Sequence, residues 1–247
     1  FIAEYKHPRF ADIEGINPYA TGDGHRLAKE MGAELINMDV TYGPEIRFVA
    51  PVKKSFVQMV PTRGPLSRVM GWCVPLIPKF VLHQIIKRLL VTWQHPENAL
   101  FDDGAILLNR DGNRFCDERV WPDREIAIAS QPDKVCYLLL DGQLVRQYSQ
   151  WPHFISTAPR IAYAYVSDYE KLRPDVTVRA ATLAQVAFAR GLPVAAVEET
   201  IAEYNRNAER PLVEGPWVLL GPAKAYFTTT EGSPAVKIIG CRPDREA

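Results

Sequence analysis

Three patterns in the sequence predict an α+β fold. Residues 104–118 combine an apolar run, an Asp-Gly turn pair and a segment in which polar and apolar residues alternate, which is typical of a β-hairpin. Residues 135–140 form a short apolar run typical of a buried strand. Two helical segments with clear start and stop signals follow between residues 182 and 205.

The chain has the size and composition of a globular protein. Its 247 residues suffice for one large domain or two small ones with a sizeable core. Lys and Arg total 29, and Asp and Glu also total 29, so the chain as a whole has no strong field favouring nucleic acid or an anionic membrane. We therefore expect a small molecule or a protein as the partner.

The cysteines indicate a reducing compartment. Cys73, Cys116, Cys136 and Cys241 include no Cys-x-x-Cys pair and no neighbouring histidine at zinc spacing, so neither a metal site nor a redox dithiol is predicted. Scattered cysteines in a chain of this size are usually reduced, which favours the cytoplasm. The chain begins at Phe1 without an initiator Met or a signal peptide pattern, so we expect an excised fragment.

The first motif in the chain is Thr21-Gly22-Asp23-Gly24, which precedes a predicted helix over residues 25–35. Thr21 or Asp23 can cap that helix, because a short oxygen-bearing side chain accepts a hydrogen bond from a free N–H group. The two glycines also let a ligand approach the backbone, and a helix N-terminus favours an anionic or hydroxyl-rich group. A capped surface helix is the alternative. Leu27 stands where a dinucleotide fingerprint has its third glycine, so this is not a Rossmann turn.

Residues 39–63 read as extended, with candidate strands at 45–52 and 55–60. The stretch 66–93 is strongly apolar, but basic residues and two prolines interrupt it, so it is not predicted to span a membrane. After Pro78, apolar pairs alternate with polar or basic pairs, which predicts a helix with one apolar and one basic face. Such a helix suits core packing or a subunit interface; a membrane-surface helix and a lid over an apolar substrate are the alternatives.

In the predicted hairpin, Ala105 to Leu108 is the first strand, Asp111-Gly112 sets the turn, and Arg114 to Cys116 is the second strand. The polar residues Asp117, Glu118 and Arg119 follow directly. A rigidly held polar cluster of this kind suits a functional site, and a solvated surface hairpin is the alternative.

Arg124 lies among carboxylates in the sequence. An Arg in such a place can stabilise anionic charge or relay a proton. The alternative is an ion pair with Asp123 or Glu125 on a surface turn.

The C-terminal half alternates strands and helices. Residues 143–148 either pair back on the preceding strand or begin a helix, and the aromatic residues from Trp151 to Tyr169 line a pocket or form core. A capping-box pattern at residues 182–185 opens a helix that Gly191 ends, and Pro193 begins a second helix that runs through Tyr204-Asn205. Two Gly-Pro pairs then punctuate a loop before a strand at 223–227 and a Thr-rich loop at 228–232.

Four of these segments resemble flavoproteins of the fumarate reductase and succinate dehydrogenase superfamily, which includes the ketosteroid dehydrogenases. The hairpin is similar to the family's Gly-Ala-x-x-x-Asn-x-x-Gly-x-Arg-Phe-x-x-Glu, and the Thr-Gly-Asp-Gly motif is similar to its flavin loop. The helical pair ending in Tyr-Asn and the Thr-rich loop also match, in the family's order. The matching residues are Thr21, Gly22, Asp23, Gly24, Ala28, Gly32, Ala33, Met38, Gly104, Ala105, Asn109, Gly112, Arg114, Phe115, Glu118, Tyr204, Asn205, Thr230 and Gly232.

The resemblance implies the capping, or substrate, domain of a flavoprotein with short pieces of the FAD-binding domain at both ends. Residues 1–44 and 223–247 would be those pieces, and residues 45–222 would be the capping domain. It also implies FAD as the cofactor of the intact protein, while the fragment itself is expected to be inactive. The residues expected at the cofactor are Thr21, Gly22, Asp23, Gly24, Thr230 and Gly232.

The reaction implied by the resemblance is hydride transfer between flavin and a substrate carbon, with a protein acid or base moving a second proton. Glu118, Arg124 and Thr229 are the expected catalytic residues. Arg124 stands two residues beyond the family's arginine, where this chain has Pro122, and Thr229 takes the place of a substrate-binding histidine. A second histidine is missing near Met38, so a bulky or hydrophobic substrate such as a steroid is expected rather than a small dicarboxylate.

The competing hypothesis is a non-enzymatic binding or assembly domain whose basic amphipathic helix contacts a partner or a second copy. The sequence contains no G-x-S-x-G nucleophile elbow, H-E-x-x-H motif or P-loop that would support another enzyme class.

Overall fold

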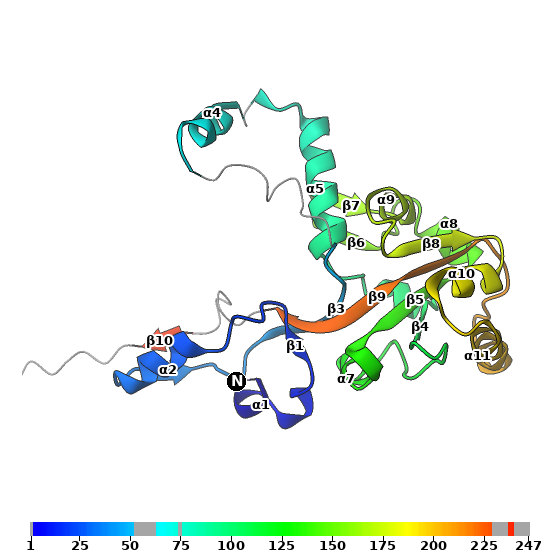
Figure 1. Cartoon of the computed structure of the whole chain (residues 1–247), viewed down its shortest axis with the longest axis horizontal. Coiled ribbons are helices and arrows are strands. Elements are labelled where there is room, and N and C mark those ends of the chain that lie inside the picture. Colours follow the sequence, from blue (N-terminus) through cyan, green and yellow to red (C-terminus); the bar gives the residue numbers. More distant parts are fainter. Residues whose placement is uncertain (1, 52–62, 74–75, 229–236, 240–247) are drawn as a thin grey trace, which may run out of the picture. The chain divides into compact units, whose positions relative to one another are not determined.

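The computed structural model describes residues 2–51, 63–73, 76–228 and 237–239 (Figure 1). The chain forms two compact units. Unit 1 combines residues 1–46, 120–135 and 224–247, and unit 2 combines residues 47–119 and 136–223. Both units contain helices and strands, as the α+β prediction requires.

Unit 2 is built on an antiparallel sheet. Strand β5 (Cys136–Leu140) pairs on one side with β4 (Ile106–Leu108) and on the other with β9 (Trp217–Thr228), which also pairs with β8 (Thr177–Ala180). All five residues of β5 are buried, as expected for an apolar strand covered on both faces. The buried strand predicted at 135–140 is therefore confirmed.

The helices of unit 2 follow their local signals closely. The Thr182 hydroxyl accepts from the Gln185 N–H and the Gln185 side chain accepts from the Thr182 N–H, so the predicted capping box opens α10 (Leu183–Arg190). Gly191 ends it with φ +69°, and α11 (Val194–Asn207) follows. Asp141 caps α8 (Gly142–Gln147), which decides between the two predictions for 143–148 in favour of the helix. Two short helices, α6 (Ala99–Asp102) and α9 (Val166–Leu172), complete this group.

The apolar stretch predicted not to span a membrane forms two helices, α4 (Pro65–Cys73) and α5 (Lys79–Trp93). Over the described residues, no helix is long and apolar enough to cross a bilayer. Helix α5 packs against α9 and against the hairpin of β6 (Ser156–Ala158) and β7 (Ala162–Ala164), next to which it runs in Figure 1. The predicted exposed basic face of α5 was wrong at Lys87. Its ammonium group is turned into the fold and pairs with Asp168 of α9 at 2.9 Å.

Of the predicted hairpin, the first strand and the turn form, but the second strand does not. The chain does reverse at residues 109–113, where the Asn109 side chain accepts from the Asp111 and Asn113 N–H groups and Gly112 has φ +81°. However, residues 114–116 form only an isolated bridge to β4 and no strand. The reason is visible at Leu107, whose N–H donates to the Glu118 carboxylate, so a side chain occupies the strand edge that a second strand would pair with.

Unit 1 contains short elements. In chain order they are α1 (Ile2–Tyr5), η1 (Pro8–Phe10), β1 (Glu14–Gly15), α2 (Asp23–Glu30), β2 (Glu34–Ile36), most of β3 (Tyr42–Phe48), α7 (Asp123–Ala129), η3 (Pro132–Lys134), the end of β9 and β10 (Lys237–Ile239). Strand β1 runs parallel to the end of β9, and β10 is antiparallel to β2. The rings of Phe10 and Phe227 meet edge to face, with centroids 5.6 Å apart, inside this unit.

Several predicted boundaries were wrong. The helix expected over 25–35 ends at Glu30, because residues 34–36 pair with β10 instead. The strand expected at 45–52 runs from Tyr42 to Phe48, and the one expected at 55–60 lies outside the described residues. The loop expected before residue 223 belongs to β9, whose first half is held between β5 and β8. The errors at the helix and at the loop come from pairing partners that are distant in the sequence.

Candidate functional site

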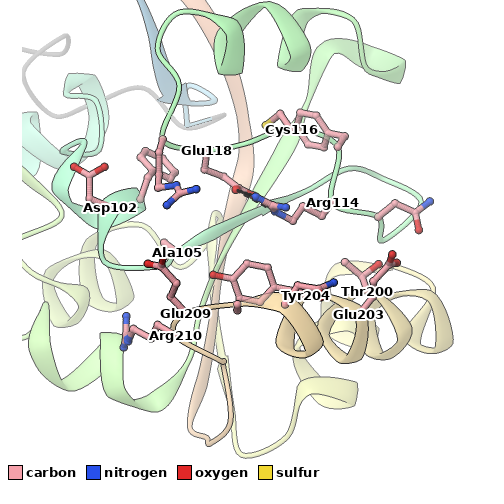
Figure 2. Close-up of a pocket in the computed structure, with 17 residues that line it drawn as sticks. Asp102, Ala105, Arg114, Cys116, Glu118, Thr200, Glu203, Tyr204, Glu209 and Arg210 are labelled. Carbon is pink, nitrogen blue, oxygen red and sulfur yellow. Dashed lines mark hydrogen bonds and ion pairs between the residues drawn. The ribbon is translucent and has the colours of Figure 1, made fainter.

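Unit 2 contains a polar cleft of about 820 Å³ between residues 101–119 and the end of α11 with the segment after it (Figure 2). Figure 2 shows the Arg114 and Glu118 side chains meeting beside the ring of Tyr204. Other labelled residues around the cleft are Asp102, Ala105, Cys116, Thr200, Glu203, Glu209 and Arg210. The cleft has the size of a small-molecule site.

Glu118 holds the wall of this cleft together. Its Oε1 accepts from the Leu107 N–H at 2.9 Å and from Arg114 Nε at 3.0 Å, and its Oε2 accepts from Arg114 Nη2 at 2.7 Å. Both oxygens are thus bonded although the side chain is buried, which is the condition for a stable buried carboxylate. The polar cluster predicted after the turn is rigid, as expected, but its buried member is bonded entirely to the protein's own groups.

Aromatic and basic groups form the rest of the wall. The Arg114 guanidinium lies 5.4 Å from the centroid of the Tyr204 ring. Burial, together with the neighbouring Glu118 carboxylate, raises the pKa of the Tyr204 hydroxyl. Arg210 donates to the Asp103 carbonyl oxygen and lies 3.6 Å from the Asp141 carboxylate. Since these arginines are already paired, the wall offers shape and hydrogen bonds rather than a strong positive field.

The exposed neighbours of Glu118 form a separate ion pair. The Asp117 carboxylate accepts from the Arg119 side chain at 3.1 Å and from the Arg119 N–H at 3.1 Å. Hydrogen bonding to the Arg119 guanidinium and N–H lowers the pKa of the Asp117 carboxyl. Both side chains are exposed, so the pair has little influence on the fold.

Unit 1 contains the second predicted catalytic residue, Arg124, on α7. Its Nε and Nη2 donate to Oε1 of Glu125 at 2.9 and 2.5 Å, and both side chains are buried. The alternative prediction named the correct partner, but the surface turn was wrong, because the pair lies inside the unit. Oε2 of Glu125 has no hydrogen-bond partner within the described part of the chain. Burial raises the pKa of the Glu125 carboxyl, although Arg124 opposes the shift.

The Thr-Gly-Asp-Gly motif forms the start of α2. Gly22, with φ +83°, is the N-cap residue, and no side chain caps the helix, so the prediction that Thr21 or Asp23 caps it was wrong. Instead the Thr21 hydroxyl donates to Asp23 at 2.8 Å, and Asp23 also pairs with Arg26. The bond from Thr21, followed by that from Arg26, lowers the pKa of Asp23. The first N–H groups of α2 are thus left without a side-chain cap, in the manner of a ligand-binding helix end.

The structure brings together some of the predicted site residues. Thr21, Gly22, Asp23 and Gly24 form one loop in unit 1, which also contains Arg124, whereas Glu118 belongs to unit 2. The predicted residues Thr229, Thr230 and Gly232 lie outside the described residues. Sequence reasoning missed the burial of Glu125 and the part that Tyr204 and Arg210 have in the cleft.

No model of a known protein family matches this sequence. Among curated proteins, the chain is 25% identical over 203 residues to a probable fumarate reductase of Shewanella frigidimarina, and the match covers 81% of this chain and 25% of that protein. It is 24% identical over 151 residues to a fumarate reductase of Schizosaccharomyces pombe, covering 61% of this chain and 23% of that protein. The chain therefore spans about a quarter of the length of these relatives.

Among solved structures, the chain is similar to the open conformation of a flavocytochrome c3 fumarate reductase. The TM-score is 0.53 and the identity 21%, and the match covers 91% of this chain and 32% of that one. This likeness confirms the predicted α+β class by a shared fold. The two sequence relatives confirm the resemblance to fumarate reductases that the motifs indicated.

Proposed function

We propose that this chain, related as it is to the flavoproteins of the fumarate reductase and succinate dehydrogenase superfamily, is part of an FAD-dependent oxidoreductase. Residues 45–222 would be its capping domain, although residues 120–135 belong to unit 1, and residues 1–44 and 223–247 would be pieces of its FAD-binding domain. One observation carries the proposal: the family's motifs occur in the family's order in a chain whose relatives over most of its length are named fumarate reductases.

The start of α2 fits a hydroxyl-rich part of FAD. Its first N–H groups have no side-chain cap, and a Cβ added at Gly24 would meet nothing within 4 Å. The exposed Asp23 carboxylate would repel a phosphate but can accept hydrogen bonds from sugar hydroxyl groups. Thr21, Gly22, Asp23 and Gly24 would hold this part of the cofactor, and Thr230 and Gly232 would contact it from the return segment. When bound, FAD would supply the hydride chemistry.

Arg124 would transfer the proton that accompanies hydride transfer. Glu125 holds its guanidinium through Nε and Nη2, which fixes the orientation of the group. Glu118 would contribute by fixing the turn at Arg114, from which the chain continues toward α7. The Thr229 hydroxyl would donate to the substrate in place of the family's histidine. Closure of the capping domain would exclude water from the reacting groups.

The proposed substrate is bulky and largely hydrophobic, for example a steroid. Support comes from the two histidine positions of the resemblance, which hold neutral residues here, because a small dicarboxylate needs cationic partners. The names of the two relatives point to fumarate as the competing substrate.

The cofactor proposal is tested by the visible absorption spectrum of the protein expressed from its natural ends, followed by the mass of whatever heat releases. Flavin bands with a released mass equal to that of FAD are expected. Replacing Asp23 by Ala should lower the bound FAD per protein, while Asp12→Ala, an exposed change in the same unit, should leave it unchanged. A colourless, folded protein that takes up no added FAD would contradict the proposal and favour a partner-binding domain.

The substrate proposal needs a separate assay. Saturated and unsaturated ketosteroids and fumarate are each mixed with the oxidised or the reduced protein, and the flavin absorbance is followed. We expect a change with a steroid and little with fumarate. Turnover with fumarate alone would reject the hydrophobic substrate while leaving the flavin assignment intact.

A further inference from the structure

The charges of this chain are unevenly distributed. Between Glu45 and Glu97 there is no Asp or Glu, yet this stretch contains eight Lys and Arg residues. Removing these eight from the 29 basic residues leaves 21 basic against 29 acidic residues in the rest of the chain. A neutral protein therefore contains one strongly cationic segment, residues 46–96, here called the basic segment. Such a segment attracts an anionic surface even though the whole chain has no net charge.

Large apolar side chains of the basic segment are exposed. On α4, Val69 and Trp72 lie three positions apart and thus on one face, and Leu76 follows the helix. Trp72 is 81% exposed and Leu76 is 80% exposed. Exposed Trp and Leu side chains this close in the sequence are typical of an interaction site, and Trp is enriched where a bilayer meets water.

Exposed cations accompany this apolar group. Arg63 precedes α4, Arg68 belongs to α4, and Arg88 lies on α5. All three side chains are exposed. Within the described residues none of the three forms an ion pair with a carboxylate, unlike Lys87, which pairs with Asp168. Arginines beside exposed Trp and Leu match a surface that is anionic outside and apolar beneath.

The burial of side chains along α5 shows which end of the helix is exposed to solvent and can contact another surface. Near its C-terminus, Leu90 and Val91 are buried against the neighbouring elements, whereas Leu82, His83 and Gln84 near its N-terminus are exposed. The helix is therefore anchored in unit 2 at one end, and its other end, which follows α4 in the chain, faces solvent.

We propose that α4 and the N-terminal end of α5 dock on an anionic lipid bilayer. Trp72, Val69 and Leu76 enter the boundary between headgroups and acyl chains, and the arginines contact lipid phosphates. The docking is peripheral, because α4 has only nine residues and no described helix is long enough to span a bilayer. This proposal does not depend on the flavin chemistry proposed above, and it suits the cytoplasmic leaflet, which is rich in anionic lipids.

The test is co-sedimentation of the intact protein with vesicles of phosphatidylcholine, either pure or with one third phosphatidylglycerol. We expect binding to the anionic vesicles only, and a blue shift of the Trp72 emission that Trp72→Phe removes. The double variant Trp72→Ser, Leu76→Ser should lower the partition coefficient at least tenfold. Its matched control is Phe188→Ser, Val213→Ser, in which side chains of the same unit that are 80% and 70% exposed are changed, and binding should be retained.

The electrostatic part is tested with Arg63→Gln, Arg68→Gln and Arg88→Gln combined. This variant should bind anionic vesicles at least tenfold more weakly and with a smaller dependence on salt, because each removed charge weakens the attraction. Lys171→Gln combined with Arg206→Gln changes exposed cations elsewhere in unit 2 and should have no effect. Circular dichroism and thermal unfolding check that every variant is folded.

Two results would overturn the proposal. If the intact protein does not bind anionic vesicles, the apolar group is covered by something else: loss of a dimer in the Trp72 and Leu76 variant would assign it to a copy of the chain, and a monomer throughout would assign it to another part of the protein. If the protein binds but the Trp72 and Leu76 variant binds equally well, the docking surface lies elsewhere.

Discussion

Two arginine–glutamate pairs have their arginines ten positions apart in this chain, and they differ in how fully their carboxylates are hydrogen-bonded. In the Arg114–Glu118 pair, the arginine side chain is 34% exposed and the glutamate 4%, and both carboxylate oxygens accept hydrogen bonds. In the Arg124–Glu125 pair, the exposed fractions are 3% and 0%, and one oxygen of Glu125 has no hydrogen-bond partner within the described residues.

This difference separates a structural role from a chemical one. In the first pair, the Glu118 carboxylate links the edge of β4 at Leu107 to Arg114 after the turn. Both of its oxygens accept hydrogen bonds, so its role is structural. In the second pair, one oxygen of a buried carboxylate lacks a hydrogen bond within the described residues, which costs stability, so such a group is usually retained where a function requires it. Perturbed buried groups of this kind are concentrated at functional sites. We therefore expect Arg124 to have the direct chemical role, in proton transfer. Glu118 is expected to act indirectly, by holding the turn in place.

The largest expected effect is on turnover. In the intact enzyme, Arg124→Met should lower kcat at least a hundredfold, since a positioned acid or base typically contributes about 100- to 10,000-fold. Arg9→Met is the control, because Arg9 is an exposed arginine that pairs with Asp123 at the start of the same helix.

The bound FAD and the unfolding temperature of the Arg124 variant must first be shown to match the wild type. If Arg124→Met does not fold, Arg124→Lys keeps a charge beside Glu125 and should still be slow, because an ammonium group cannot reproduce the two bonds of the guanidinium. A loss of turnover below about tenfold would remove Arg124 from the mechanism.

A second prediction concerns the hydrogen bonds that the Glu118 carboxylate accepts. Glu118→Ala should lower the free energy of unfolding by about 3 kcal/mol, because it leaves the Leu107 N–H and the Arg114 guanidinium without their acceptor. Glu118→Gln keeps an acceptor for Leu107 and should cost about 1 kcal/mol. Urea unfolding measures both. Equal and negligible costs would show that the carboxylate does not hold the turn, and a large loss of kcat in a fully stable Glu118→Gln protein would give Glu118 a direct catalytic part.

The third prediction is a pH dependence that belongs to the buried pair. The pKa of Glu125 is raised in the folded protein, so the folded state binds the proton more tightly than the unfolded state. Its ionisation therefore destabilises the fold as the pH rises above the unfolded value of about 4.3. The unfolding temperature of Glu125→Gln should rise relative to that of the wild type as the pH increases from acid to neutral. A constant difference would mean that Glu125 does not titrate within this range.

The smallest effect is expected at the exposed pair, and with the opposite sign. The pKa of Asp117 is lowered by its bonds from Arg119, so its stabilisation is complete above the unfolded value of about 3.9 and is lost as the pH falls through the lower folded value. Asp117→Asn should cost less than about 1 kcal/mol at neutral pH and nothing in strong acid. A larger cost would show that this pair also holds the cleft wall.

Local signals predicted the elements that depend on neighbours in the sequence. The capping box from Thr182 to Gln185, the stop at Gly191 and the buried strand ending at Leu140 occur where expected, because their main determinants lie within a few residues. The turn at Gly112 also formed as predicted. The motifs that carried the resemblance were equally local, and relatives found by sequence confirmed it.

Long-range contacts decided the rest. The second hairpin strand is absent because Glu118, eleven residues from Leu107, takes the N–H that a strand would use. The helix predicted to reach residue 35 stops early because residues 34–36 pair with a segment about two hundred residues away.

Sequence alone thus determined the α+β class, the start and stop of α10 and the resemblance to a flavoprotein superfamily, since those depend on short patterns. Only the tertiary structure decided that Arg124 and Glu125 are buried, that Lys87 is turned inward and that Trp72 is not. The physical reason is that burial depends on what packs against a side chain, and the partners lie far away in the sequence.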